Sequence, residues 1–284
     1  MSTTIPPSKK KILVLGATGK TGSRIIQRLT NLNCPVQHGS RSSTPPFDWE
    51  NPATWRDAVA NADTVYISFQ PDLAMPGAVE TIRQFTQIAV GQGVKKFVLL
   101  SGRGEPEAQQ CEDVVKEAGA AWTIVRASWF NQNFSEGNFL EPILAGHVAL
   151  PAGNIGEPFI DADDIADVAL AALTRDGHDG QLYEVTGPRL LTFEQAINEI
   201  AQATQRPIRY EQISTEAYAS SMRDLGLPDN LISLITYLFA EVLDGRNAYI
   251  SDGVERALGR KATDFSQYVR KTLSSGVWGN QAPI

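Results

Sequence analysis

An apolar segment followed by three glycines, KILVLGATGKTG at Lys11–Gly22, constrains the fold of this chain more than any other feature. Ile12–Leu15 are all apolar, as in a strand that is buried on both faces. Gly16, Gly19 and Gly22 follow with the spacing G-x-x-G-x-x-G, and an amphipathic helical pattern begins directly after them. The segment therefore predicts a strand, a tight glycine turn and the first turn of a helix.

Each glycine of this turn has an expected role in binding a dinucleotide. Gly16 would permit the sharp turn, Gly19 would let a pyrophosphate approach the backbone, and Gly22 would let the helix pack closely on the strand. The helix N-terminus offers free N–H groups and a partial positive charge to a phosphate. The alternative is a purely structural turn that binds nothing. The cofactor residues expected here are Gly16, Thr18, Gly19, Lys20, Thr21 and Gly22.

Strand and helix patterns alternate over the first 125 residues. The expected strands are Ile12–Leu15, Pro35–His38, Thr64–Phe69, Lys96–Leu100 and Ala121–Val125, with Pro45–Trp49 as a further extended piece. The expected helices between them are Lys20–Leu32, Pro52–Ala60, Pro76–Val90 and Glu105–Ala118. This alternation predicts an α/β fold of the Rossmann type, with a doubly wound parallel sheet and helices on both faces.

The alternation weakens after Val125, and the remaining patterns are mainly helical. We expect a dinucleotide-binding domain over residues 1–130 and a smaller, mostly helical C-terminal lobe over residues 131–284. Gln181–Val185 is a later strand that can return to the main sheet.

Ligands of open parallel sheets bind at the carboxyl ends of the strands, which gives further candidates. Arg41 follows the second strand, and no carboxylate lies within residues 38–43, where one would bind the ribose hydroxyls of NAD. A guanidinium can pair with a 2′-phosphate, so we expect NADP rather than NAD, although NAD remains possible. The alternative is that Arg41 is an ordinary solvated residue. The other cofactor candidates are Phe69, Gln70, Ser101 and Gly102.

Trp129, Phe130 and Asn133 follow the last of these strands. They are expected either to form a wall over the nicotinamide and a flat acceptor or to fill the core where two lobes meet.

Composition excludes several classes of function. The net charge of −7 argues against nucleic-acid binding, and no apolar run is long enough to span a membrane. Two cysteines, and an N-terminus without a signal-like apolar core, predict a cytoplasmic protein. The three histidines show no ligand spacing, so no metal site is expected.

Five segments together resemble the NmrA-like, atypical branch of the short-chain dehydrogenase/reductase superfamily. These are LVLGATGKTGSRI, VKKFVLLSG, AWTIVRASWFNQNF, FIDADDIADVA and GVERALGRKATDFSQYVR, in that order along nearly the whole chain. Within this branch the chain is similar to NAD(P)H-quinone and azo- or triphenylmethane-dye reductases and to ergot-alkaloid reductases. The resemblance implies hydride transfer from NAD(P)H to a small conjugated acceptor, and a homodimer is possible.

One departure from the wider superfamily affects the expected chemistry. The superfamily uses a Tyr-x-x-x-Lys pair with a nearby serine, but the helix EPEAQQCEDVVKEAG contains no tyrosine. Ser101 matches the region of the family serine, and Lys116 lies outside that motif. The catalytic residues therefore stay unknown, and a quinone or iminium acceptor, which carries its own electron sink, is favoured. Some relatives bind the dinucleotide without turnover, so a redox-sensing regulator is the alternative.

Overall fold

The structure, a computed structural model, describes residues 11–279 of the chain. The first ten residues, on which the expectation about a signal segment depends, lie outside this range. The described chain divides into two compact units. The first comprises residues 11–127, 162–185 and 252–260, and the second comprises residues 128–161, 186–251 and 261–279. The chain thus returns twice to the first unit, and the first return contains Gln181–Val185, the later strand expected to rejoin the main sheet.

A six-stranded parallel sheet forms the centre of the first unit, with the strand order β2-β1-β3-β4-β5-β7. Its strands are β1 (Ile12–Leu15), β2 (Val36–Gly39), β3 (Thr64–Ile67), β4 (Lys96–Gly102), β5 (Ala121–Ala127) and β7 (Gln181–Val185). β7 is the late strand that returns to the sheet, where it pairs with β5. The order reverses between β1 and β3, and ligands of such sheets bind at a reversal of this kind.

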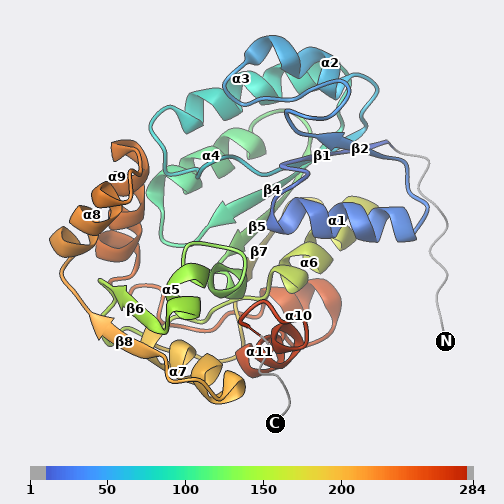
Figure 1. Cartoon of the computed structure of the whole chain (residues 1–284). Helices are drawn as coiled ribbons and strands as arrows, with labels where there is room; N and C mark the ends of the chain where they lie inside the picture. The colour runs from blue at the N-terminus through green and yellow to red at the C-terminus, as the bar shows by residue number, and fades with distance from the viewer. Residues whose placement is uncertain (1–10, 280–284) are drawn as a thin grey trace. The chain divides into compact units, whose positions relative to one another are not determined.

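Helices cover both faces of this sheet (Figure 1). On one face lie α1 (Lys20–Asn31) and α6 (Ala162–Thr174), and α10 (Gly253–Leu258) packs against α6 and β7. On the other face lie α2 (Trp55–Val59), which follows the short 3-10 helix Pro52–Thr54, α3 (Ala78–Gly91) and α4 (Pro106–Lys116). The parallel sheet with helices on both faces confirms the expected Rossmann-type fold.

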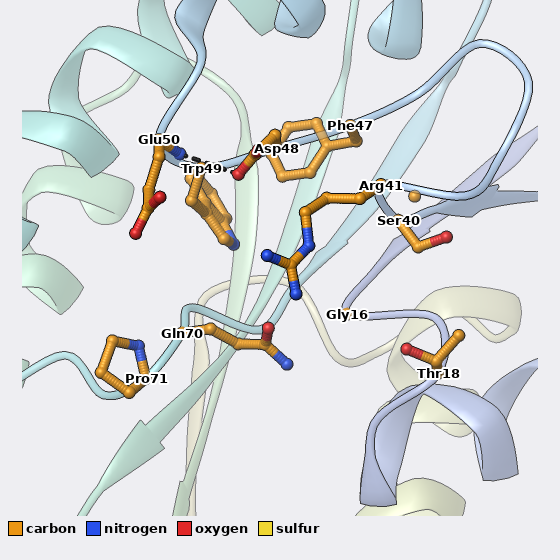
Figure 2. Close-up of a pocket in the computed structure, with 11 residues that line it drawn as sticks. Gly16, Thr18, Ser40, Arg41, Phe47, Asp48, Trp49, Glu50, Gln70 and Pro71 are labelled. Atoms are coloured by element: carbon orange, nitrogen blue, oxygen red, sulfur yellow. Dashed lines mark hydrogen bonds between the residues drawn. The ribbon is translucent and has the colours of Figure 1, made fainter. Parts of the chain in front are cut away.

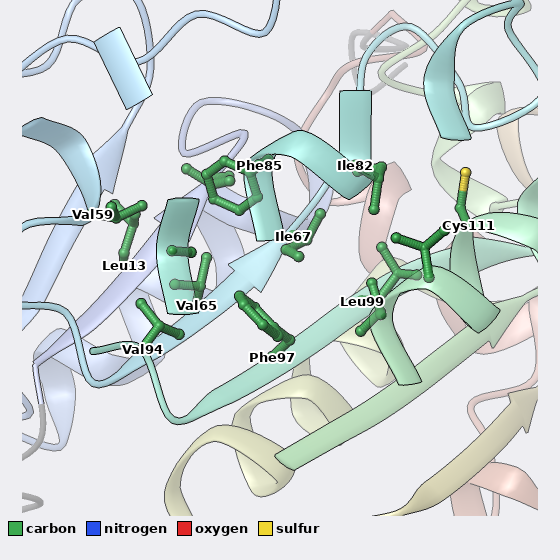
Figure 3. Packing of buried hydrophobic residues seen from close by; sticks show 14 of the residues in the cluster. Leu13, Val59, Val65, Ile67, Ile82, Phe85, Val94, Phe97, Leu99 and Cys111 are labelled. Atoms are coloured by element: carbon green, nitrogen blue, oxygen red, sulfur yellow. The ribbon is translucent and has the colours of Figure 1, made fainter. Parts of the chain in front are cut away.

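Residues from neighbouring strands build the core between the sheet and α3 (Figure 3). Leu13 pairs in register with Val65, and Val65 pairs with Phe97, so that the three side chains form a row across the sheet. Ile82 and Phe85 of α3 belong to the same buried cluster. Because these strands are covered on both faces, their sequences are continuously apolar rather than alternating.

Pro45–Trp49 differs from its predicted extended structure, because it forms an irregular loop and no strand of the sheet. Its two prolines lack the backbone N–H that a strand ladder requires. The segment is held by its aromatic rings instead. Phe47 lies in the first unit's core, and its ring is 4.8 Å from that of Trp49.

The second unit is mainly helical, as expected. Its strands β6 (His147–Leu150) and β8 (Arg209–Gln212) form a parallel pair. Its helices are the 3-10 turn Asn131–Phe134, α5 (Leu140–Ala145), α7 (Phe193–Thr204), α8 (Thr215–Asp224), α9 (Asp229–Tyr237), a π-helical turn (Leu238–Val242) and α11 (Phe265–Leu273). A separate core rich in phenylalanine holds these elements together. Over residues 11–279, no helix is long and apolar enough to cross a membrane.

Candidate functional site

The three glycines between β1 and α1 meet different constraints within the fold. Gly16 has φ +66°, a conformation that favours glycine. A Cβ on Gly22 would overlap the carbonyl oxygen of Gly16, so Gly22 is required for the helix to approach the turn. Gly19 has φ −79°, and a Cβ there would meet only the Gly16 oxygen at 3.3 Å and Gln70 Nε2 at 3.8 Å. A side chain at Gly19 would therefore fit only tightly against the backbone of the turn.

A pocket of about 420 Å³ opens beside this turn, at the carboxyl ends of β1, β2 and β3 (Figure 2). Its walls come from the glycine turn, the loop after β2 and the residues that follow β3. The lining residues are Gly16, Thr18, Gly39, Ser40, Arg41, Phe47, Asp48, Trp49, Glu50, Gln70 and Pro71. Four predicted cofactor residues, Gly16, Thr18, Arg41 and Gln70, thus meet in one cavity at the point where the strand order reverses.

Arg41 is exposed and extends into this pocket, toward Gln70 and Trp49 (Figure 2). Its loop is held by its own serines, since Ser43 Oγ donates to the Ser40 carbonyl at 2.7 Å and accepts from the Ser40 N–H at 3.0 Å. No other residue within 11–279 forms an ion pair with Arg41. The guanidinium is therefore available to an anionic ligand.

Sequence reasoning missed the pocket wall at residues 47–50. Trp49 is fixed there, because its indole N–H donates to the Ser68 carbonyl at 3.1 Å and its ring lies 5.0 Å from that of Phe69. Phe69 packs against the core and is not among the lining residues. The sequence did contain a signal, the FDW triplet three residues after the polar loop, but its position in space depends on tertiary packing.

The first turn of α1 carries the remaining predicted residues of the glycine segment, Lys20, Thr21 and Gly22. Thr21 is buried, and its hydroxyl accepts a 2.9 Å hydrogen bond from Tyr66, which joins α1 to β3. Burial raises the pKa of Tyr66, so this phenol keeps its proton. No acidic residue lies in the first turn of α1 and no side chain caps its N-terminus, so this end of the helix is suited to an anion.

Ser101 lies in a network of buried and half-buried charged side chains at the ends of β4, β5 and β7. Its hydroxyl donates to Glu112 Oε1 at 2.7 Å, and Arg126 binds the same fully buried carboxylate through Nε at 2.8 Å and Nη2 at 2.6 Å. Glu184 continues the network, at 3.7 Å from Arg126 and 3.0 Å from the buried Arg103. Ser101 is thus engaged with other side chains of the first unit.

Glu112 occupies the position four residues before Lys116, where a Tyr-x-x-x-Lys pair would place its tyrosine. Lys116 Nζ lies 3.7 Å from Glu112 Oε2 and 2.9 Å from Asp113 Oδ1. Glu112 thus anchors Arg126 of β5 to this helix.

Trp129, Phe130 and Asn133, the predicted acceptor residues, belong to the second unit and are half-buried. The Trp129 ring packs 5.4 Å from Phe193 and 5.1 Å from Phe239. Both readings of these residues, a ligand wall and core filling, fit this packing within the second unit.

Metal binding has no support among residues 11–279, since no group of three or more His, Cys, Asp or Glu side chains could hold an ion there.

Comparison with known proteins gives one family and several relatives. A family described as NAD(P)H-binding matches residues 16–176. The NAD(P)H azoreductase of Xenophilus azovorans is 29% identical over 91% of this chain and 96% of its own length. Prestalk A differentiation protein A of Dictyostelium discoideum is 26% identical over 97% of this chain and 96% of its own length.

One solved structure, the NADPH-dependent quinone oxidoreductase of Escherichia coli complexed with NADPH, has a similar fold. It aligns with a TM-score of 0.74 and 20% identity, over 92% of this chain and 99% of that one.

Proposed function

We propose that this chain, which belongs to the NAD(P)H-binding family, is an oxidoreductase that transfers hydride from NAD(P)H to a small conjugated acceptor such as a quinone or an iminium. The observation that carries the proposal is the pocket at the ends of β1, β2 and β3, where the glycine turn and Arg41 meet. The azoreductase and quinone reductase named above support this reaction class.

The residues around the pocket fit a dinucleotide. The glycine turn, where Gly19 carries no side chain, and the N–H groups at the start of α1 would accept the pyrophosphate. Gly16, Thr18 and Gln70 would line the same subsite, and Arg41 would bind a 2′-phosphate. We therefore favour NADP, with NAD as the weaker ligand. When bound, the reduced nicotinamide supplies the hydride.

The proposed class of acceptor follows from the absence of a tyrosine on α4. The helix carries no tyrosine, and Ser101 donates to the buried Glu112 rather than to an open site. An acceptor that holds the incoming electron pair in its own conjugated system needs no phenolic donor, so its positioning supplies most of the rate. We assign Trp129, Phe130 and Asn133 of the second unit to the acceptor wall. Ser101 and Gly102 stay proposed contacts of the cofactor.

The expected partners, location and assembly of the protein also stay predictions. The chain would act on a small molecule, without nucleic acid or membrane, in the cytoplasm, and a homodimer remains possible.

The test is a turnover assay with reduced cofactor and a panel of quinones, followed at the absorbance band of reduced nicotinamide. We expect oxidation that depends on the acceptor and is faster with NADPH than with NADH. Tight NADPH binding without oxidation by any acceptor would instead identify a redox-sensing regulator.

A further inference from the structure

Arg24 and Arg28 lie one turn apart on α1 and make similar contacts. Each donates a hydrogen bond to the backbone carbonyl four residues earlier: Arg24 Nη1 to Lys20 at 2.7 Å, and Arg28 Nη1 to Arg24 at 3.1 Å. Both also contact Asp163 of α6, the helix that packs beside α1 in the first unit (Figure 1). Their side chains are almost equally buried, with exposed fractions of 20% and 22%. The two arginines therefore differ mainly in which carbonyl group they contact.

The Lys20 carbonyl, which Arg24 contacts, belongs to the first turn of α1. The first hydrogen bond of the helix runs from the Ser23 N–H to the Gly19 carbonyl at 3.0 Å. The N–H groups before Ser23 have no acceptor within the helix, and they face its N-terminal end. One of them, the Thr21 N–H, belongs to the same peptide group as the Lys20 carbonyl. Arg24 thus acts on a peptide whose N–H is directed at the glycine turn.

We propose that Arg24 is a positioning residue for the dinucleotide: its guanidinium polarises the Lys20–Thr21 peptide and so strengthens the hydrogen bond from the Thr21 N–H to the pyrophosphate. The placement of the pyrophosphate at this turn rests on the proposed function. Arg28 lacks this effect, because the carbonyl that it contacts is followed by the N–H of Ile25, which lies inside the helical ladder.

Two physical effects give the Arg24 contact its influence. A cation that binds a carbonyl oxygen draws electron density along the peptide, and hydrogen bonds joined in this way strengthen one another. The positive charge also adds to the partial positive charge of the helix N-terminus, which favours an anion. Both effects act on the pyrophosphate, which is common to NADPH and NADH.

Asp163 holds the Arg24 side chain in place from the neighbouring helix. The guanidinium is bound at Nε by Asp163 Oδ1, at 3.4 Å, and at Nη1 by the Lys20 carbonyl. The same Asp163 oxygen lies 2.8 Å from Arg28 Nη2, and Arg28 Nε also contacts Asp167 of α6 at 2.7 Å. Both arginines therefore brace α1 against α6, so a purely structural effect is expected from the loss of either one.

Arg24 and Arg41 act on different parts of the cofactor in this proposal. Arg41 faces the 2′-phosphate, which only NADPH carries, whereas Arg24 acts on the pyrophosphate. Adenosine 2′-phosphate carries the first group and lacks the second. Loss of Arg24 should therefore weaken NADPH and NADH equally and leave adenosine 2′-phosphate unaffected. A general loosening of the first unit would weaken all three ligands.

The test compares the wild type with Arg24→Gln and with the matched control Arg28→Gln, which removes the same charge from the next turn of the helix. Calorimetry gives the Kd of NADPH, NADH and adenosine 2′-phosphate, and thermal unfolding gives the stability of each variant. Arg24→Lys, which keeps the charge, is the conservative variant. Arg24→Met, which keeps a long side chain, takes the place of Arg24→Gln if that protein does not fold.

We expect Arg24→Gln to weaken NADPH and NADH by about fivefold each, the upper range for one charge near a helix end, and to leave adenosine 2′-phosphate unchanged. Arg24→Lys should recover most of the lost affinity, and Arg28→Gln should bind all three ligands as the wild type does.

Three results would overturn the role of Arg24. These are unchanged dinucleotide affinity in Arg24→Gln, an equal loss in Arg28→Gln, and a loss that extends to adenosine 2′-phosphate. Each of them leaves the proposed function standing, because the wild type still binds the dinucleotide. Absence of NADPH binding by the wild type would refute the proposed function and this inference with it.

Discussion

The two halves of one sheet edge differ in how they use polar residues. At the ends of β1, β2 and β3, Arg41 and Gln70 line an open cavity, and Arg41 has no ion-pair partner within residues 11–279. At the ends of β4, β5 and β7, Ser101, Glu112 and Arg126 bind one another in the interior. A polar residue after a strand is therefore a stronger ligand candidate where the fold leaves its hydrogen-bonding groups unsatisfied.

The difference predicts opposite consequences of mutation on the two sides. Changes in the β4–β5–β7 network should reduce stability, because they leave buried groups without partners. Changes around the pocket should reduce cofactor affinity and spare the fold.

The largest effect is expected for Glu112→Ala. This substitution leaves Arg126 without its buried partner and removes the acceptor of Ser101. Loss of one member of a buried ion pair costs about 3–5 kcal/mol, so the free energy of unfolding measured by urea denaturation should fall by that amount. Glu117, the C-cap residue that follows this helix, is exposed, and Glu117→Ala should change stability by less than about 0.5 kcal/mol. Equal stabilities for Glu112→Ala and Glu117→Ala would contradict the structural role of the network at the ends of β4, β5 and β7.

Gly19→Asp should abolish NADPH binding without unfolding the protein. Its carboxylate would occupy the space proposed for the pyrophosphate and repel its negative charge. Within the protein, the new Cβ would meet the Gly16 carbonyl oxygen at 3.3 Å and Gln70 Nε2 at 3.8 Å. Calorimetry measures the affinity, and circular dichroism checks the fold. Gly91→Asp is the control, since a side chain at the end of α3 meets nothing within 4 Å. Wild-type affinity in a folded Gly19→Asp protein would exclude the glycine turn as the binding site.

A smaller and more selective effect is expected for Arg41→Ala. A charge-assisted contact between Arg41 and the 2′-phosphate, at an exposed position, should favour NADPH over NADH about tenfold. Arg41→Ala should therefore weaken NADPH binding by about tenfold and leave NADH binding nearly unchanged, and added salt should reduce the difference. The Kd of NADPH and of NADH, measured at two ionic strengths, gives the result, with the exposed Arg56 of α2 changed to Ala as the control. Equal losses for both cofactors would make Arg41 an ordinary surface residue.

The smallest effect is expected for Lys116→Ala. Lys116 pairs with Asp113 at the surface of α4 and has no tyrosine partner, so turnover should stay within about twofold of the wild type. A hundredfold loss of turnover in a folded variant would show that this lysine takes part in the reaction.

The sequence predicted the β1–turn–α1 unit because the apolar run and the glycine spacing depend on local geometry alone. It could not predict the wall at Phe47–Glu50, because aromatic packing against Phe69 and Phe85 places that loop. It also suggested Ser101 from its position after β4, but only the fold reveals that Glu112 accepts its hydroxyl group. Residue type alone therefore does not distinguish a residue that lines the pocket from one that is bonded inside the protein. Strand order and burial make that distinction.

Amide hydrogen exchange with and without NADPH tests the central claim most directly, because it maps the bound cofactor onto the chain. The account predicts slower exchange on binding in residues 16–22, 39–50 and 69–72, which form the glycine turn and the other walls of the pocket. Binding that leaves the exchange of these three segments unchanged would contradict the proposed site.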